Sequence, residues 1–210
     1  MTARQVIIWR HGRTEYNLQW RMQGQVDTEL DEVGKQQARM VAPILAQDYR
    51  PDLIVTSDLS RAARTAEALA DLTGLTPVPD PRLRERGFGK WEGLTQEEVE
   101  ERWPGCWLKW RRGPDYGDVG IEPIEELAER AVASITEHTE AVPDGGTLVI
   151  VAHGALATVA TKVLIGLSTD WRGMVGLANA HFTVLLPSRR GVGAWRVLAH
   201  NVGVDPATEG

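Results

Sequence analysis

The chain has little cysteine, no excess of positive charge and no long apolar run, and each absence excludes a class of protein. Its 210 residues include one cysteine, Cys106, which excludes an intramolecular disulfide and a Cys-x-x-Cys metal or redox site. The formal net charge of -6 disfavours a nucleic-acid-binding surface but not a local anion pocket. No stretch approaches the roughly 20 apolar residues that span a bilayer. We therefore expect a soluble cytoplasmic protein with no nucleic-acid or membrane partner.

Apolar strands alternate with helical patterns along most of the chain. This alternation predicts an α/β fold, with a mainly parallel central sheet and helices on both faces. The predicted strands are residues 6–9, 52–57, 147–152, 181–187 and 194–200, the last two joined by a turn at 188–193. The predicted helices are residues 31–47, 59–74, 94–103, 122–142 and 155–166. We expect Asp31 to cap the first helix, Gly74 to end the second, Thr95 and Glu98 to form a capping box, and Pro123 to lie in a first turn.

Residues 83–120 interrupt the alternation and are rich in Trp, Arg, Gly and Pro. We interpret them as a small inserted cap segment over the active site, within a single domain of residues 1–210. Trp103, Trp107 and Trp110 have the spacing of one helix face. The favoured interpretation is that these rings pack one helix onto the body. The alternative is that one ring lines the cleft and stacks on a sugar or another bulky leaving group.

Three groups of reactive residues follow predicted strands. Arg10, His11 and a glycine follow the first strand, Arg61 lies in the first turn after the second, and His153 follows the strand at 147–152. Ligands bind outside the carboxyl ends of the strands in open α/β sheets. Arginines, histidines, helix N-termini and glycines that admit a ligand closely would suit an anion with several oxygens. The pattern therefore predicts a phosphate site.

A phosphate site becomes catalytic when it has a nucleophile and a proton donor. A neutral imidazole nitrogen of His11 can attack phosphorus if the other ring nitrogen is held as a donor. The stretch "LRERGFGKWEG" offers two carboxylic acids, Glu85 and Glu92. Glu85 precedes a Gly-Phe-Gly turn that would bring it over the cleft, whereas a structural role is as reasonable for Glu92.

Four motifs now carry a family resemblance. Arg10-His11-Gly12-x-Thr14-x-x-Asn17, "SDLSRAARTAE", "LRERGFGKWEG" and "VAHGA" occur in order and resemble the histidine phosphatase superfamily, also called the phosphoglycerate mutase-like family. The resemblance implies that fold, a phosphorylated His11 and Glu85 as the acid and base. It further implies phosphate contacts from Arg10, Arg61, His153, Asn17 and Gln23. It implies neither a metal nor a cofactor.

Several blocks resemble one group of this superfamily, the actinobacterial glucosyl-3-phosphoglycerate phosphatases: "RMQGQVDTEL", "VAHGALATVATKVL" and "GLANAHFTVL". The chain departs from that group at 120–123, where Gly-Ile-Glu-Pro replaces Gly-Gly-Glu-Ser. The implied activity is hydrolysis of a small phosphoester, glucosyl-3-phosphoglycerate or a related phosphorylated sugar or acid. A phosphoglycerate mutase, a broad-specificity acid phosphatase and a non-catalytic phosphate-binding protein stay as alternatives, although residues 86–89 differ from the mutase pattern. The oligomeric state is left open, with a homodimer as one alternative.

Overall fold

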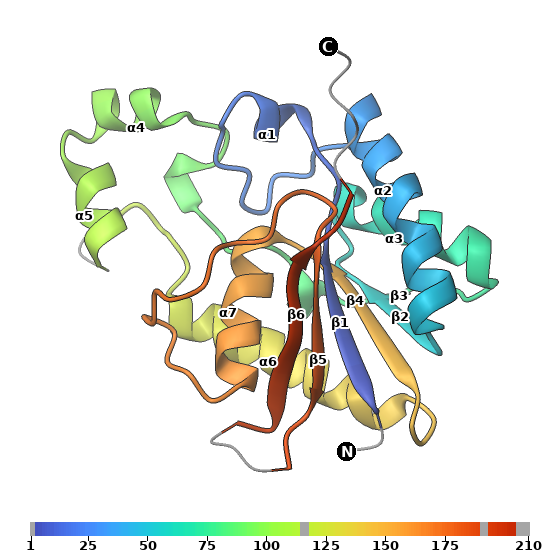
Figure 1. Ribbon diagram of the computed structural model, residues 1–210. Helices are drawn as coiled ribbons and strands as arrows, with labels where there is room; N and C mark the ends of the chain where they lie inside the picture. The colour runs from blue at the N-terminus through green and yellow to red at the C-terminus, as the bar shows by residue number, and fades with distance from the viewer. Residues whose placement is uncertain (1–2, 114–117, 190–192, 205–210) are drawn as a thin grey trace.

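The backbone forms an α/β fold around one central sheet (Figure 1). The computed structural model describes residues 3–113, 118–189 and 193–204. The sheet has the strand order β3-β2-β4-β1-β5-β6, and its first four strands run parallel to one another. β5 is antiparallel to both of its neighbours. The strands are β1 (Gln5–Arg10), β2 (Leu53–Thr56), β3 (Val78–Pro79), β4 (Thr147–Ala152), β5 (Phe182–Pro187) and β6 (Trp195–Val202). The predicted fold class is confirmed.

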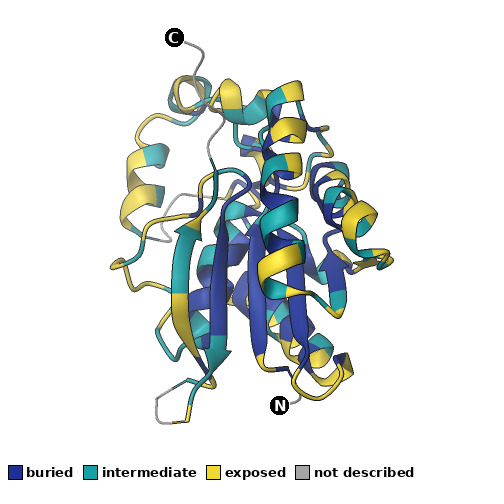
Figure 2. Ribbon diagram, turned by 45° about the vertical axis from the view of Figure 1, so that its right-hand side comes forward, coloured by how far each residue is buried: buried dark blue, intermediate teal, exposed yellow. Residues whose placement is uncertain are grey.

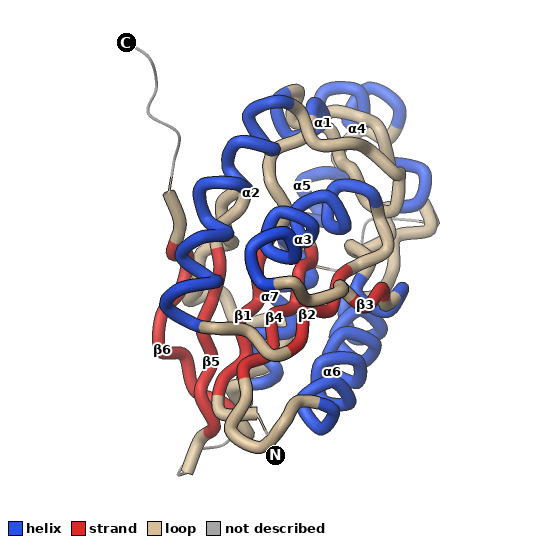
Figure 3. The backbone as a smooth tube through the Cα atoms, turned by 90° about the vertical axis from the view of Figure 1, so that its right-hand side faces the viewer, coloured by secondary structure: helices blue, strands red, loops and turns tan. Residues whose placement is uncertain are grey.

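Helices cover both faces of the sheet. The helices are α1 (Glu15–Leu18), α2 (Glu32–Ile44), α3 (Ser60–Thr73), α4 (Gln96–Arg102), α5 (Cys106–Arg112), α6 (Ile124–Ala141) and α7 (Gly154–Leu164). α6 and α7 pack on one face and α2 and α3 on the other, so that the sheet lies between α2 and α6 (Figure 3). In β1, Val6 and Ile8 contact the first layer, while Ile7 and Trp9 contact the second. Figure 2 shows the resulting buried sheet centre.

The predicted helix ends are largely confirmed. The Asp31 side chain caps α2, Gly74 ends α3 with a φ of 71°, and a capping box starts α4 at Thr95. Pro123 is the N-cap residue of α6 rather than a residue of its first turn. The short helix α1, the strand β3 and a π-helical turn that extends α2, η1 (Leu45–Tyr49), were not predicted. Residues 190–192 of the predicted turn between the last two strands lie outside the described residues.

The segment at 83–120 contains α4, α5 and the 3₁₀ turn η3 (Gly89–Trp91), and lies on the same side of the molecule as α1 (Figure 1). The prediction of one helix through the three tryptophans is wrong. α4 ends at Arg102, and α5 begins after Gly105, whose φ of 78° breaks the helix. Trp107 and Trp110 instead pack on the fully buried Trp91, with ring centroids 6.0 Å away in both cases. The cap segment therefore has an aromatic core of its own.

Candidate active site

The two predicted histidines meet where β1 and β4 end. Arg10 is the last residue of β1 and pairs across the sheet with Ala152, the last residue of β4. His11 and His153 follow directly, and their ring centroids lie 5.2 Å apart. Both residues are buried, with 2% and 0% of their surface exposed. The parallel register therefore brings two motifs that are distant in sequence into one site.

The hydrogen bonding of His11 leaves one ring nitrogen available for reaction. Nδ1 lies 2.6 Å from the carbonyl oxygen of Gly12, and because a carbonyl only accepts, the ring proton is on Nδ1. Burial, followed by the charges of Arg61 and Arg10, holds the pKa of His11 well below its usual range. The imidazole is therefore neutral at pH 7, with a free lone pair on Nε2. A nucleophilic histidine requires this state.

The glycines after the two histidines serve different purposes. A Cβ on Gly12 would lie 2.3 Å from the backbone oxygen of Gly34, so this glycine allows α2 to pack closely. A Cβ on Gly154 would lie 3.3 Å from Nε of Arg10. Gly154 therefore leaves space for the guanidinium in the site. The expectation that each glycine admits a ligand is corrected at Gly12, where the close neighbour is backbone.

Three buried nitrogen atoms beside His11 have no hydrogen-bond partner among the described residues: Nε of Arg10, Nε of Arg61 and Nδ1 of His153. A buried donor without a partner costs free energy, and such groups are rare in folded proteins. Nε of each arginine can only donate, and Nδ1 of His153 is a donor in the tautomer whose Nε2 accepts from the Ser57 hydroxyl at 2.8 Å. Such a group of buried nitrogens around one nucleophile is the expected arrangement of a site whose acceptor is a ligand. An anion with several oxygens would satisfy all three.

Other nitrogens of the two arginines are held by protein carbonyl oxygens. Nη1 of Arg10 donates to the Leu177 carbonyl at 2.6 Å. Nη1 and Nη2 of Arg61 donate to the carbonyls of Val26 and Gly24, both at 2.8 Å. These bonds fix the two guanidinium planes before any ligand arrives. Such preorganisation makes a cation effective in stabilising developing negative charge.

Burial weakens the preference of these groups for the charged form. It lowers the pKa of Arg10, and it lowers that of Arg61 to about 10. A guanidinium is not deprotonated in proteins, so both side chains are cations. Burial is also the largest cause of the low pKa of His153, ahead of the Arg61 charge, and this imidazole is neutral. Two buried cations without a carboxylate in direct contact are costly. A bound anion would remove much of that cost.

Two predicted side-chain amides have their oxygens occupied by protein donors. Oδ1 of Asn17 accepts from the Thr14 backbone N–H at 3.2 Å and from Nδ2 of Asn179 at 3.1 Å. Oε1 of Gln23 lies 2.9 Å from the hydroxyls of both Thr14 and Thr28. The NH₂ groups of both amides are thereby left as donors toward the site. Asn179, which also donates to the His11 carbonyl at 3.3 Å, lies in the quoted block "GLANAHFTVL" but was not singled out from the sequence.

The structure separates the two candidate acids. The Glu85 carboxylate accepts hydrogen bonds at 3.0 Å from the N–H groups of Ala155 and Leu156, at the start of α7 directly after His153. Glu92 instead joins two backbone segments, because its Oε1 accepts from the N–H groups of Gln25 and Phe88. Its position is that of a structural carboxylate. Of the two candidate acids, Glu85 is the one that lines the cleft with His11.

A cleft of about 160 Å³ contains six of the seven predicted residues, and His153 lies beside it in ring contact with His11. The cleft is lined by Arg10, His11, Asn17, Arg21, Met22, Gln23, Gly24, Arg61, Glu85 and Phe88. Arg21 and Phe88 were not predicted to line the site, although both lie in quoted motifs. Their side chains add one cation and one apolar ring to the phosphate donors.

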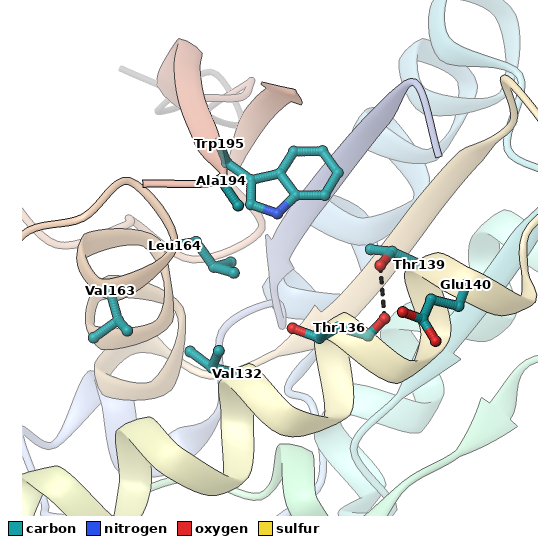
Figure 4. Close-up of a pocket in the computed structure, with 8 residues that line it drawn as sticks. All are labelled: Val132, Thr136, Thr139, Glu140, Val163, Leu164, Ala194 and Trp195. Atoms are coloured by element: carbon teal, nitrogen blue, oxygen red, sulfur yellow. Dashed lines mark hydrogen bonds between the residues drawn. The ribbon is translucent and has the colours of Figure 1, made fainter. Parts of the chain in front are cut away.

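A second cavity is larger, at about 330 Å³, but has none of this chemistry. It lies between α6, α7 and the start of β6, with Val132, Leu164 and Trp195 among the residues of its wall (Figure 4). The only charged side chain that lines it is Glu140. Its size does not make it the active site, because none of the predicted catalytic or phosphate-binding residues reaches it.

Among the described residues, no three side chains of His, Cys, Asp or Glu gather closely enough to hold a metal ion. No helix in this part of the chain combines the length and apolar character needed to cross a membrane.

Comparison with known proteins identifies the family. The profile of the histidine phosphatase superfamily (branch 1) matches residues 6–202, and the chain belongs to this superfamily. The glucosyl-3-phosphoglycerate phosphatase of Mycolicibacterium vanbaalenii is 37% identical over 224 aligned residues, which cover 100% of this chain and 99% of that protein. The one from Mycobacterium tuberculosis strain H37Rv is 39% identical over 193 residues, covering 88% and 86% respectively.

A solved structure agrees with these relatives. A mycobacterial glucosyl-3-phosphoglycerate phosphatase in complex with VO3 matches with a TM-score of 0.86 and 37% identity, over 95% of this chain and 100% of that one. The resemblance inferred from the four motifs is therefore confirmed, both for the superfamily and for the group within it.

Proposed function

We propose that this protein is a metal-independent phosphomonoesterase that works through a phosphohistidine on His11, with glucosyl-3-phosphoglycerate as its substrate. The observation that carries the proposal is the arrangement around His11. A neutral imidazole with a free Nε2 is surrounded by three buried nitrogens that lack a protein partner. That arrangement suits the transfer of a phosphoryl group, whose oxygens would accept from Arg10, Arg61 and His153.

In the first half-reaction, Nε2 of His11 forms a bond to phosphorus as the bond between phosphorus and the ester oxygen breaks. The fixed guanidinium groups balance the charge on the transferred oxygens. Glu85 in its protonated form gives its proton to the departing oxygen, so the product leaves as an alcohol. The products of this step are the free alcohol, phosphohistidine and ionised Glu85.

In the second half-reaction, water takes the place that the alcohol left. Ionised Glu85 accepts a proton from the water as its oxygen attacks phosphorus and the phosphorus–nitrogen bond breaks. Inorganic phosphate leaves, and neutral His11 and protonated Glu85 are restored. The carboxylate thus acts once as an acid and once as a base.

The proposed substrate rests on two observations. Two relatives that match over most of both chains, at 37% and 39% identity, are glucosyl-3-phosphoglycerate phosphatases, and the cleft adds Arg21 and Phe88 to the proposed phosphate donors. The Arg21 side chain is 28% exposed and pairs through Nη1 with Glu98 at 2.8 Å. The carboxylate of a phosphoglycerate would share this guanidinium with Glu98. An apolar ring such as Phe88 suits a sugar face.

A screen of phosphate release tests the proposal. Glucosyl-3-phosphoglycerate, 3-phosphoglycerate, simple sugar phosphates and p-nitrophenyl phosphate are compared by kcat/KM, with a parallel assay for conversion of 3-phosphoglycerate to its 2-isomer. We expect glucosyl-3-phosphoglycerate to lead and isomerisation to be absent. Similar kcat/KM values for all esters would favour the broad-specificity phosphatase, and efficient isomerisation would favour the mutase.

Three further predictions belong to this proposal. We expect a single domain over residues 1–210 in which the segment at 83–120 acts as the cap of the cleft. We also expect a cytoplasmic location, and a homodimer stays one alternative for the assembly. Cell fractionation and size-exclusion chromatography with light scattering would test the last two.

A further inference from the structure

Arg130, on α6, binds the backbone of the loop that carries Glu85. Its Nη1 donates to the carbonyls of Arg82 and Arg84 at 2.7 and 2.6 Å, and its Nη2 donates to the carbonyl of Glu85 itself at 2.9 Å. The side chain is only 20% exposed. One guanidinium therefore donates hydrogen bonds to three backbone carbonyls, one in η2 (Pro81–Leu83) and two in the irregular stretch between η2 and η3.

Glu122 completes this arrangement from the opposite side. Its Oε1 accepts from Nε of Arg130 at 2.7 Å, while its Oε2 accepts from Nη2 of Arg130 and from the N–H of Gly87, both at 2.9 Å. The Glu122 backbone N–H also donates to the Gly87 carbonyl at 2.9 Å. Arg130 and Glu122 thus contact the backbone on both sides of the proposed acid, at Arg84 and at Gly87.

The carboxylate of Glu85 is held separately, by the start of α7. Two attachments therefore define the acid: Arg130 and Glu122 place its backbone, and the helix start orients its oxygens. Without the guanidinium, the carbonyls of residues 82, 84 and 85 would lose a shared donor that no neutral side chain could replace. Arg130 does not line the cleft, and its hydrogen bonds reach the site through the Glu85 loop. Its charge is also the smallest of the causes that lower the pKa of His153.

We infer that Arg130, together with Glu122, is a positioning residue that sets the reach of Glu85 toward the leaving oxygen. This inference rests on the proposed function, because it requires Glu85 to be the acid. Arg10, His11, Arg61 and His153 are attached to β1, α3 and β4, and neither Arg130 nor Glu122 has a hydrogen bond to them. We therefore expect this clamp of Arg130 and Glu122 to act mainly on proton transfer and to change anion binding little. A displacement of a catalytic group by about 1 Å is enough to cost on the order of a hundredfold in rate.

The test compares Arg130→Met with Glu85→Gln and with Ile135→Ala, a packing control at a fully buried α6 residue in the hydrophobic cluster that also includes Leu83. Each variant is assayed with an alkyl phosphate and with p-nitrophenyl phosphate, and vanadate inhibition reports anion binding. We expect Arg130→Met to lower kcat for the alkyl ester about 10- to 100-fold and for p-nitrophenyl phosphate by less than about 5-fold. Vanadate inhibition should change by less than about threefold.

The controls separate this inference from the proposed function. If Glu85→Gln shows the leaving-group dependence but Arg130→Met slows both esters equally, as Ile135→Ala is expected to do, the clamp is merely structural and the inference is wrong. If Glu85→Gln itself shows no such dependence, the assignment of the acid fails first. Should Arg130→Met not fold, Arg130→Lys and Glu122→Gln are measured in the same way, and equal slowing of both esters in these variants would overturn the inference.

Discussion

The two halves of the proposed active site are held in different ways. The phosphoryl-binding half, Arg10, His11, Arg61 and His153, comes from the ends of β1 and β4 and from the first turn of α3. His11, Arg61 and His153 are buried, and Arg10 is partly buried. The acid half depends on Glu85, whose loop has little regular structure and is held by polar contacts. The first half is fixed by packing and register, and the second by a few charged hydrogen bonds. The halves should therefore respond separately to substitution.

The largest effect is expected for the nucleophile of the first half. His11→Ala removes Nε2, the proposed nucleophile, from beside the unpartnered nitrogens of Arg10, Arg61 and His153. Turnover should therefore fall on the order of a thousandfold or more with every ester. Acid-labile phosphate trapped on wild-type His11 but absent from the variant would support this role, with circular dichroism to show an intact fold. Wild-type turnover in the variant would contradict the covalent mechanism.

The second prediction breaks the acid half alone. Glu85→Gln should slow phosphorylation of His11 on the order of a hundredfold with an alkyl or sugar phosphate, because an alkoxide leaves poorly without a proton. With p-nitrophenyl phosphate the loss should be under about tenfold, since that leaving group needs little help. Rapid-quench measurement of phosphoenzyme formation isolates this half-reaction from the later attack by water.

The matched variant is Glu92→Gln, which keeps an oxygen that can accept from the backbone of Gln25 and Phe88. It should show small and similar losses with both esters. Equal slowing by Glu85→Gln, with dependence on the leaving group only in Glu92→Gln, would reverse the roles of the two carboxylates.

The same contrast explains what the sequence could predict. The site residues on regular elements follow from a rule, because parallel strands end at one edge of the sheet; Arg10, His11 and His153 were found in this way, and Arg61 from the helix start that follows β2. Irregular segments lack the regular spacing of apolar residues that predicts helices and strands, so their contacts cannot be predicted from the sequence in this way. The bonds of Arg130 to three loop carbonyls, of Asn179 to Asn17, and the position of Arg21 depend on how loops close in space. The break at Gly105 was missed because the tryptophan spacing suits one helix, whereas Pro104 and Gly105 end it locally.

The third prediction tests whether Arg61, in the phosphoryl-binding half, acts through its positive charge alone or also through the planar geometry of its guanidinium. Arg61→Lys keeps a cation but loses the planar fork that donates to Val26 and Gly24 and directs Nε toward the ligand. We expect kcat/KM to fall about 10- to 100-fold. Arg84→Lys is the control, because Arg84 pairs with Asp58 and does not line the cleft. A loss below about threefold for Arg61→Lys, equal to about 0.7 kcal/mol, would mean that Arg61 is not a phosphate clamp.

The smallest effect is expected from a chelator. Chelation tests whether the phosphoryl-binding half can balance the charge of the phosphoryl group without a metal ion. Arg10 and Arg61 stay cationic at pH 7 and would neutralise the phosphoryl charge that a metal ion balances in other phosphatases. A divalent cation at the same place would be repelled by both guanidinium groups. Treatment with EDTA followed by gel filtration should therefore change kcat/KM by less than about 1.5-fold, whichever ester is used. Magnesium or zinc added back is the control. Inactivation by EDTA that magnesium or zinc alone reverses would contradict this prediction. It would show that a metal ion, and not the two arginines alone, balances the negative charge of the transferred phosphoryl group.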